Sequence, residues 1–409
     1  MMLSVLEAQQ RILSYFSPTE LIHVPLDQSA GRVLALDCFA TNDLPPFNNS
    51  AMDGFAIIAQ DILKASPNHP VFLKVVADIP AGSRSNVVIS HGLAARIMTG
   101  APLPNGADAV VMIENTDCNF HTPGNPPPER VAVFHPSASG TNIRQKGEDI
   151  PAGQITIRKG SMLRPQDLGL LAMLGVATIP VHRAPCIALL SSGDELISVD
   201  APLTPGKIRD ANTYTLNAFA QQTGAKVIRL GIVPDDRTAI KSVLDLAVDK
   251  KADLIVSSAG VSVGAFDFVR QVVEEHGELD FWKVNVRPGK PLAFGKYHDI
   301  PFFGLPGNPV SAFISFELFV RPVLQKISGN ASYYRPRQIV RLQEEITSDG
   351  RESYLRATVV EESGHWLAKL TGHQGSGNLL SLVQANALLI VPSGVKSLPA
   401  GTDLEAWFI

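Results

Sequence analysis

A chain of 409 residues with 45% apolar and 18% charged residues is too long for a single hydrophobic core, so we expect two to four folded domains. A net charge of −4 excludes the global basic character of a nucleic-acid-binding protein, and an anionic ligand would need a local cluster of cations. No apolar run approaches the roughly 20 residues of a membrane span, and the N-terminus lacks a signal-peptide pattern. The three scattered cysteines lack metal-ligand spacing and favour reduced thiols in the cytoplasm.

The first part of the chain predicts one amphipathic helix followed by short strands. Residues 4–16 repeat apolar positions at helical spacing, and Ser4 with Glu7 forms a capping box. A second helix, over residues 165–174, has proline at its start and glycine just after its end. Short apolar runs between turn signals predict strands at 55–58, 71–76, 95–98, 109–113, 130–134 and 155–163.

From about residue 178 strands and helices alternate, which predicts a three-layer, mostly parallel α/β domain. Its expected strands are residues 186–190, 226–233, 254–258, 279–284 and 302–305. Its expected helices are residues 212–222, 237–250, 267–276 and 309–327. Residues 330–409 return to short strands and predict a small β-barrel or sandwich, with strands at 338–342, 354–361, 366–371, 387–391 and 403–409.

Two polar stretches stand out before the α/β domain. Residues 48–53 crowd Asn, Ser and Asp side chains behind two prolines, although a capped turn entering the next strand explains this pattern equally well. Residues 144–149 place two cations and two carboxylates in one turn, for which a solvated charged turn is the default interpretation. Thr99, which follows the strand at 95–98, could cap its turn or contact a substrate.

A loop rich in glycine and serine follows the expected strand 254–258. Gly260 and Gly264 can take positive φ and leave room for a ligand, and a helix begins at about Asp267. Unpaired backbone N–H groups and the helix dipole would then point at one anion. An ordinary connection between a strand and a helix is the alternative for this loop taken alone.

Cations and carboxylates are expected at the same edge of the α/β sheet, because ligands bind beyond the carboxyl ends of parallel strands. Residues 283–290 carry three cations, and a helix starts at Asn308. These groups would hold a large anion. Glu195, Asp236 and Asp267 follow other strands and offer the hard oxygen ligands that Mg²⁺ prefers. The combination indicates phosphate chemistry assisted by a metal ion.

Seven motifs in this order resemble the MoeA family of molybdopterin molybdenumtransferases, to which the C-terminal domain of gephyrin is related. The resemblance covers nearly the whole chain. The motifs are Asn49–Gly54, Met98–Pro102, Asn142–Asp149, Ser192–Leu196, Gly260–Gly264, Arg287–Pro291 and Gly304–Pro309.

The resemblance implies an elongated subunit of four domains that works as a homodimer. Residues 1–42 with 140–177 would form a linking and dimerisation domain, 43–139 a β-rich domain, 178–328 the α/β molybdopterin-binding domain and 329–409 a small β-barrel. The implied reaction takes adenylated molybdopterin and molybdate, cleaves the adenylate and gives molybdenum cofactor and AMP. The adenylyltransferase of the preceding step would be the pathway neighbour, with no nucleic-acid or membrane partner.

The resemblance also implies an active site between the α/β domain of one subunit and the β-rich domain of the other. The Gly260–Gly264 loop would receive the pterin phosphate, and the Mg²⁺ ligands would be Glu195, Asp236 and Asp267. The implied catalytic residues are Asp53, Thr99, Arg144, Asp149, Glu195, Asp236 and Asp267. The implied substrate-binding residues are Gly260, Ser262, Gly264, Lys283, Arg287, Lys290, Pro306, Asn308 and Ser376.

Three positions depart from the family pattern. Ala259 stands where glycine is common, Arg287 where some members have lysine, and Asn48 where aspartate is frequent, which leaves the metal ligands near Asp53 open. The alternatives are a non-catalytic scaffold like gephyrin, the adenylyltransferase itself, and a tungsten-inserting member of the family. The β-rich segments and the charged site residues favour the molybdenumtransferase, whereas molybdate and tungstate have the same charge and nearly the same size.

Overall fold

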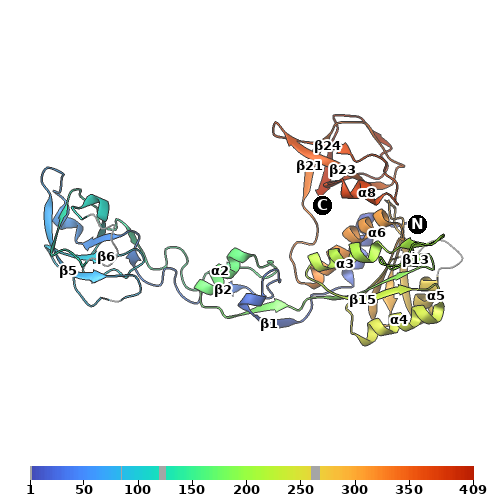
Figure 1. Cartoon of the computed structure of the whole chain (residues 1–409), viewed down its shortest axis with the longest axis horizontal. Coiled ribbons are helices and arrows are strands. Elements are labelled where there is room, and N and C mark those ends of the chain that lie inside the picture. Colours follow the sequence, from blue (N-terminus) through green and yellow to red (C-terminus); the bar gives the residue numbers. More distant parts are fainter. Residues whose placement is uncertain (1, 84, 119–125, 259–267) are drawn as a thin grey trace. The chain divides into compact units, whose positions relative to one another are not determined.

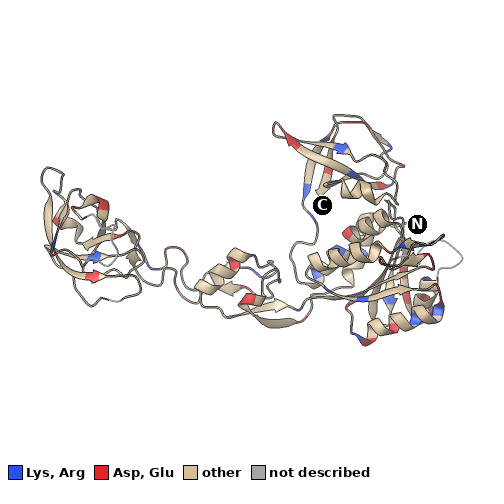
Figure 2. Ribbon diagram, viewed as in Figure 1, with Lys and Arg blue, Asp and Glu red and all other residues tan. Residues whose placement is uncertain are grey.

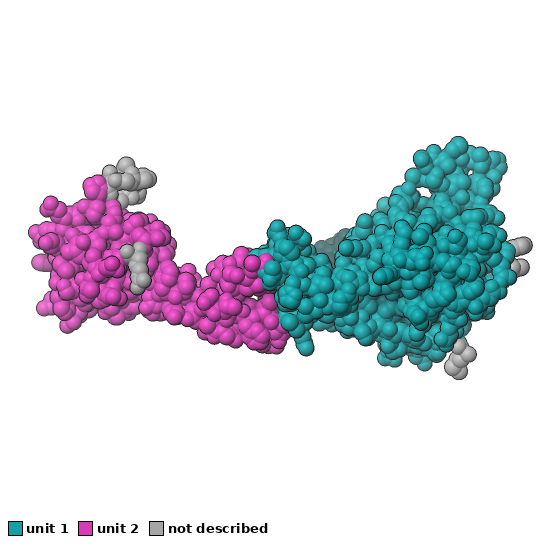
Figure 3. Space-filling view, turned by 90° about the horizontal axis from the view of Figure 1, so that it is seen from below, with its two compact units in different colours: residues 1–36, 159–168, 178–409 teal, residues 37–158, 169–177 magenta. Residues whose placement is uncertain are grey.

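The structure, a computed structural model, describes residues 2–83, 85–118, 126–258 and 268–409. The chain forms two compact units (Figure 3). Unit 1 comprises Met1–Leu36, Lys159–Leu168 and Thr178–Ile409, and unit 2 comprises Asp37–Arg158 and Gly169–Ala177. No helix in the described part of the chain is long and apolar enough to cross a membrane. The finer division into four domains stays a prediction.

Unit 2 contains a five-stranded sheet in the order β7-β4-β6-β5-β8, of which β5 and β6 are labelled in Figure 1. All five strands were predicted from their apolar runs. Phe55 and Ala56 pack in different buried clusters, because successive residues point to opposite faces of a strand. A Cβ atom at Gly54 would lie 1.9 Å from the Val111 carbonyl oxygen, so only glycine fits there. The strands are β4 (Gly54–Ile57), β5 (Val71–Ile79), β6 (Leu93–Ile97), β7 (Ala109–Met112) and β8 (Arg130–Val133).

The remaining elements of unit 2 are short. The predicted strand over 155–163 is wrong in length, because the chain turns at Gly160, where φ is +81°. The predicted helix over 165–174 is confirmed as α2 (Pro165–Met173), which begins in unit 1 and ends in unit 2. The two-stranded pairs are β2 (Cys38–Phe39) with β10 (Ile155–Ile157) and β3 (Asn49–Ser50) with β9 (Ile143–Arg144), and the 3₁₀ turns are η2 (Ala59–Ile62) and η3 (Ile113–Asn115).

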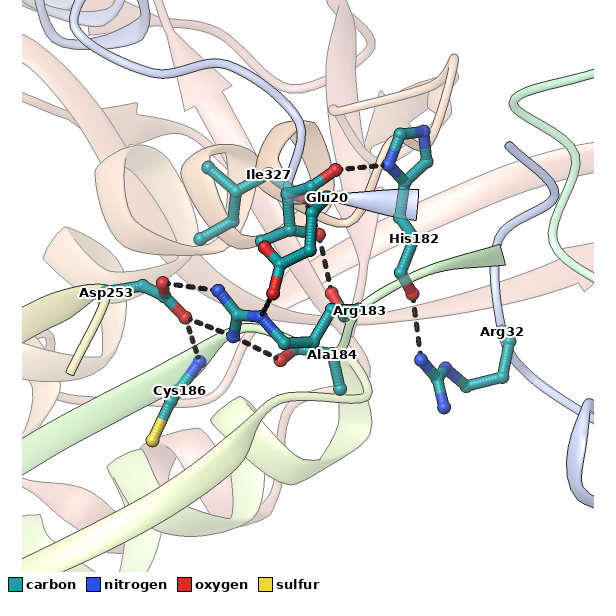
Figure 4. A network of polar contacts seen from close by, with 9 residues as sticks. Glu20, Arg32, His182, Arg183, Ala184, Cys186, Asp253 and Ile327 are labelled. Carbon is teal, nitrogen blue, oxygen red and sulfur yellow. Dashed lines mark hydrogen bonds and ion pairs between the residues drawn. The ribbon is translucent and has the colours of Figure 1, made fainter. Parts of the chain in front are cut away.

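In unit 1 a two-stranded ribbon leads into the α/β domain. It pairs β1 (Leu21–Pro25) with β11 (Thr178–His182), and the 3₁₀ turn η1 (Leu26–Gln28) follows β1. Figure 4 shows how Arg183 fixes its base: the guanidinium donates to both oxygens of Asp253 at 2.7 and 2.8 Å and to Glu20 at 2.5 Å. Asp253 also accepts the Cys186 backbone N–H at 2.7 Å. The ribbon is therefore bound to the starts of two central strands.

The α/β domain contains a six-stranded sheet in the order β15-β12-β16-β20-β19-β17. The first four strands are parallel, and β19 is antiparallel to both of its neighbours. The strand β19 was missed because it contains Pro291 and Gly295, which weaken a strand pattern; a Cβ at Gly295 would lie 2.0 Å from the Glu278 carbonyl oxygen. The strands are β12 (Cys186–Ser192), β15 (Lys226–Val233), β16 (Leu254–Ser258), β17 (Gly277–Lys283), β19 (Pro291–Tyr297) and β20 (Ile300–Leu305).

Helices cover both faces of this sheet and confirm the three layers. Leu189 packs with α1, α3, α6 and α7, whereas the adjacent Leu190 packs with α4 and α5. The predicted single helix over 309–327 is wrong in one respect, because a π-helical segment, η4 (Phe316–Val320), interrupts it just before Pro322. The predicted capping box of α1 is present. The helices are α1 (Val5–Ser14), α3 (Asn212–Gln222), α4 (Arg237–Asp249), α5 (Phe268–His276), α6 (Pro309–Ser315) and α7 (Arg321–Ile327).

The C-terminal strands close into a five-stranded barrel, β23-β24-β21-β27-β25, in which β25 pairs back to β23. Alternate residues such as Leu355 and Ala357 fill its interior. The strands are β21 (Arg337–Leu342), β23 (Glu352–Glu362), β24 (His365–Leu370), β25 (Ala387–Val391) and β27 (Asp403–Phe408). Shorter elements are β13 (Leu196–Ile197) with β14 (Ile208–Arg209), β22 (Ile346–Thr347) with β26 (Ser397–Leu398), β18 (Val286–Arg287) and the unpredicted helix α8 (Leu379–Val383).

Candidate functional site

The carboxyl ends of the α/β strands gather at one edge of the sheet. β17 and β20 are both antiparallel to β19, so β17 runs in the same direction as the four parallel strands. Lys283 therefore ends its strand at the edge where Ser192, Ser258 and Leu305 end theirs. Acidic and basic residues are interspersed over the ribbon rather than separated by sign (Figure 2), so any anion site must come from a local arrangement.

A buried polar network holds the loops at this edge. The side-chain amide of Asn212, in the first turn of α3, donates to Ser258 Oγ and to the Gly307 carbonyl oxygen, both at 2.7 Å. It thereby connects the end of β16 to the loop that contains Pro306 and leads into α6. Ser192 Oγ is buried and has no hydrogen-bond partner among the described residues. Such a hydroxyl remains available to a ligand or a water molecule.

Two of the three predicted metal ligands are described. Asp236 is the N-cap of α4, and its Oδ1 accepts the Ala239 backbone N–H at 2.8 Å. Glu195 lies against the backbone of Gly193, where φ is +149° and a Cβ atom would lie 2.5 Å from Glu195 Oε2. The glycine at this position therefore leaves room for the carboxylate. Both acids follow neighbouring strands, β12 and β15.

Two further acids, Asp194 and Asp235, accompany this pair. Asp194 Oδ1 accepts the Asp235 backbone N–H at 3.2 Å. Burial, and then the negative charge of Asp194, raise the pKa of the Asp235 carboxyl. In the described ranges no group of three or more His, Cys, Asp or Glu side chains is arranged to hold a metal ion. The metal site stays a prediction, because the structure does not describe the predicted site residues Gly260, Ser262, Gly264 and Asp267.

The predicted basic segment, residues 283–290, connects the α/β sheet to the barrel. Its middle part, β18, pairs in parallel with β23, which places Arg287 opposite Ser353. The Val284 N–H donates to the Lys290 carbonyl oxygen at 3.1 Å and closes the loop. At Gly289, where φ is +107°, a Cβ atom would lie 2.7 Å from Ser315 Oγ, so glycine lets the loop pack against α6.

A buried arginine that the sequence did not indicate lies on β23. Arg356 is fully buried and donates from Nε to Ser381 Oγ at 3.1 Å and from Nη2 to the Gly375 carbonyl oxygen at 3.0 Å. Its Nη1 has no partner among the described residues, and no carboxylate there pairs with it. Burial, and then the charge of Arg287, lower its pKa to about 10. A buried cation without a counter-charge is costly, and an anion would relieve that cost.

The loop above Arg356 lies at the start of α6. The Asn308 side-chain amide donates to Ser376 Oγ at 3.1 Å, and the Val310 N–H donates to the Ser376 carbonyl oxygen at 3.1 Å. The structure thus brings the predicted residues Asn308 and Ser376 into direct contact. Together with the bond from Arg356 to the Gly375 carbonyl oxygen, these contacts hold this loop against the start of α6.

The predicted residues of unit 2 form a second group. Asp53 Oδ1 accepts both the backbone N–H and the hydroxyl of Thr99 at 2.7 Å. Arg144 forms an ion pair with Asp149 and donates to Glu148 at 3.3 Å. The two pairs are connected, since β3 pairs with β9 and the Ser50 carbonyl oxygen accepts the Gly100 N–H at 2.8 Å. Exposed ion pairs contribute little to stability, so stabilisation of the fold does not by itself explain this cluster of charges.

The residues that sequence reasoning missed depend on long-range contacts. A charged residue inside the apolar run 354–361 was the available signal for Arg356. Because side chains alternate along β23, Arg356 lies on the same face as Tyr354 and not on the face that fills the barrel interior. Tyr354 packs with the α/β core. Asn212 looked like an ordinary residue at a helix start, and no local pattern indicated its contacts to two other loops.

Comparisons with known proteins identify related sequences along the whole chain. The family description "MoeA N-terminal region (domain I and II)" matches residues 3–175, "Probable molybdopterin binding domain" matches residues 188–326, and "MoeA C-terminal region (domain IV)" matches residues 340–409. Molybdopterin molybdenumtransferase 2 of Mycobacterium tuberculosis is 39% identical over 99% of both chains. Molybdopterin molybdenumtransferase of Nostoc is 37% identical over 93% of this chain and 87% of its own.

A solved structure agrees with these sequence matches. The crystal structure of the molybdopterin biosynthesis moeA protein from Pyrococcus horikoshii superposes with a TM-score of 0.84 at 30% identity and covers 100% of both chains. Sequence and fold therefore agree over the full length, including the closed barrel at the C-terminus. On this evidence the chain belongs to the MoeA family of molybdopterin molybdenumtransferases.

Proposed function

We propose that this protein takes adenylated molybdopterin and molybdate, cleaves the adenylate, inserts molybdenum, and releases molybdenum cofactor and AMP. The buried Arg356 is the observation that supports this function most directly. Its charge has no carboxylate partner among the described residues, and it lies beside Arg287 under the loop of Ser376. Molybdate or a phosphate group would supply the missing negative charge. The names of the relatives support the choice of substrates.

The basic segment would hold the oxyanion from the sheet edge. Lys283 and Lys290 are exposed at the ends of β17 and β19, where they attract an incoming anion. Arg287 presents a planar fork of donors that suits tetrahedral oxyanions. The hydroxyl of Ser376 and the amide of Asn308 would orient the bound group. Holding both reactants in one geometry removes much of the entropic barrier of a two-substrate reaction.

We also propose that Mg²⁺ binds at the ends of β12 and β15. Glu195 and Asp236 supply hard oxygen donors of the kind that Mg²⁺ prefers, and the nearby Asp194 and Asp235 add negative charge. Asp267, outside the described residues, is the proposed third ligand. When bound, Mg²⁺ neutralises charge that develops on phosphate oxygens during cleavage. Asp236 keeps one oxygen on the α4 N-terminus and can offer the other.

A homodimer with active sites shared between subunits is the proposed assembly. The two groups of site residues support it, since Asp53, Thr99, Arg144 and Asp149 belong to unit 2 and the anion-binding residues to unit 1. Mixing the Asp53→Ala and Arg356→Met variants tests it. Random exchange would make half of the dimers mixed, each with one intact site, and restore about a quarter of wild-type activity. Inactivity of the mixture would refute the shared site.

The four domains expected from the sequence and a cytoplasmic location complete the proposal. All three cysteines are free in the structure, which is typical of a reducing compartment. The pathway neighbour remains the adenylyltransferase that makes the adenylated substrate.

The function is tested by incubating the purified protein with adenylated molybdopterin, molybdate and Mg²⁺ and measuring AMP. We expect AMP release that depends on molybdate, and a loss of at least about 100-fold in Lys283→Ala. Lys250→Ala, an exposed lysine at the opposite end of the sheet, is the matched control. Absence of AMP from the wild-type reaction would contradict the proposed function. Parallel reactions with tungstate compare the two oxyanions.

A further inference from the structure

A cavity of about 810 Å³ in unit 2 has no role in the site described so far. Its lining includes Phe47, Asn48, Asn86, Asn105 and Lys146. Its volume lies within the range of small-molecule sites. The cavity adjoins the Asp53–Thr99 group, because β3 begins directly after Asn48.

The lining of this cavity combines an aromatic ring with side-chain amides. Phe47 is 42% exposed, which is high for a phenylalanine. The side chains of Asn86 and Asn105 make no hydrogen bond to the described residues, and Asn48 uses only Oδ1, which accepts the Lys146 N–H at 2.7 Å. The described residues that line the cavity include no carboxylate and one cation, Lys146, whose ammonium group is ion-paired with Asp43 at 3.3 Å. The phenylalanine ring can stack on a planar ligand ring, and the amides can form hydrogen bonds with the donors and acceptors of that ring.

Backbone contacts hold the main chain at Asn48 and Asn105 in place without a ligand. The Leu103 N–H donates to the Asn48 carbonyl oxygen at 2.9 Å, and the Ile89 N–H donates to the Asn105 carbonyl oxygen at 2.8 Å. At Gly106, where φ is +88°, a Cβ atom would lie 2.1 Å from the Ile89 carbonyl oxygen. This close approach fixes the backbone next to Asn105. A cavity with a fixed wall binds a rigid ligand at little ordering cost.

We propose that this cavity binds an amino-substituted nitrogen heterocycle whose ring stacks on Phe47 and whose ring nitrogen and amino group pair with asparagine amides. The absence of carboxylates in its described lining suits a heterocycle that carries phosphate. The proposal rests on the proposed function, because adenylated molybdopterin contains two such rings, adenine and the pterin.

The test measures binding of AMP and of neopterin, as separate probes, to the full-length protein by calorimetry and pterin fluorescence. We expect Phe47→Ala and Asn105→Asp to weaken one probe at least tenfold and to leave the other unchanged, which identifies the ring. Asn105→Asp is nearly isosteric, so it preserves the fold if Phe47→Ala does not. Phe72→Ala replaces another exposed phenylalanine, which is 53% exposed and lies outside the cavity, and should change neither affinity.

Three results would overturn the proposal. In the first, both probes bind the two cavity variants as tightly as they bind Phe72→Ala. In the second, wild type binds neither probe. In the third, ribose 5-phosphate binds as tightly as AMP and its affinity depends on Phe47 in the same way. The AMP-release reaction separates this proposal from the proposed function. If wild type releases AMP but the variants bind the probes unchanged, only the proposed role of the cavity is wrong. If wild type releases no AMP but its probe binding depends on Phe47, the cavity proposal stands and the proposed transferase function is wrong.

Discussion

Replacing Arg356 by methionine should separate anion binding from stability. The side chain makes hydrogen bonds to Ser381 Oγ at 3.1 Å and to the carbonyl oxygens of Gly375 at 3.0 Å and His373 at 3.4 Å. At about 1 kcal/mol each, their loss costs about 2–3 kcal/mol. Against this, removing a buried cation without a counter-charge recovers several kcal/mol of desolvation. The two effects nearly cancel, so we expect the melting temperature to change by only a few degrees.

Anion binding should respond very differently. Loss of one preorganised charged donor reduces catalysis by about 10²–10³. We therefore expect Arg356→Met to release AMP at least about 100-fold more slowly than wild type. Molybdate should raise the melting temperature of wild type, because a ligand that binds only the folded state stabilises it, and it should not raise that of the variant.

Thermal unfolding with and without molybdate, followed by the AMP assay, provides the measurement. Arg341→Met is the matched control, because Arg341 belongs to the same barrel but is exposed and paired with Asp403. It should keep both the molybdate-dependent shift and the activity. The reasoning would be refuted if molybdate still raised the melting temperature of Arg356→Met. It would also be refuted if Arg356→Met were severely destabilised and Arg356→Lys regained stability without regaining the molybdate-dependent rise in melting temperature.

Four further substitutions test the fold and one ionisable group. Gly54→Ala should unfold the β-rich part of unit 2, because a Cβ there would lie 1.9 Å from the Val111 carbonyl oxygen. At Gly169 in α2 a Cβ would meet no atom within 4 Å, so Gly169→Ala should stabilise the fold by about 1 kcal/mol. Melting temperatures measured by calorimetry distinguish the two variants. Asn212→Ala removes hydrogen bonds to the buried Ser258 hydroxyl and to the Gly307 carbonyl oxygen, and should lower the free energy of unfolding by about 2 kcal/mol in urea titrations. Burial, and then the nearby Asp117 charge, raise the pKa of Cys118 to about 11, so its alkylation at pH 9 should be about 50-fold slower than that of a model thiol. The Cys118 thiol loses its proton at lower pH in the unfolded chain than in the folded one, so its contribution to stability should fall as pH rises from 9.0 to about 11. This pH dependence should be absent in Cys118→Ala. Equal alkylation rates, or equal melting of the two glycine variants, would contradict these expectations.

Local patterns predicted most of the elements. Apolar runs bounded by turn residues predicted the five strands of the large sheet in unit 2, and the capping box with helical spacing predicted α1. The errors fall where tertiary contacts override local preference. The strand β19 contains a proline and a glycine that only its neighbours β17 and β20 explain. The π-helical segment η4 also has no marker in sequence beyond the later Pro322.

The candidate site was predictable where its residues directly follow strands. Parallel strands deliver their carboxyl ends to one edge, so the order of strands and loops already gathers Glu195, Asp236 and Lys283. The contact between Asp53 and Thr99 could be expected only through the family resemblance, because 46 residues separate the two side chains. Their roles in catalysis remain a prediction that the mixed-dimer experiment addresses.

The sequence by itself determined the alternating α/β domain, the β-rich segments around it and the loops that carry charge, because each depends on periodicity and turn chemistry within about 15 residues. Only the tertiary structure decided that Arg356 lies buried with one nitrogen unpartnered among the described residues. That position results from closing the barrel and packing one face of β23 on the α/β core, where β18 pairs with β23 and Asn308 bonds to Ser376. Contacts between residues so distant in sequence depend on the whole packed fold, which no local pattern encodes.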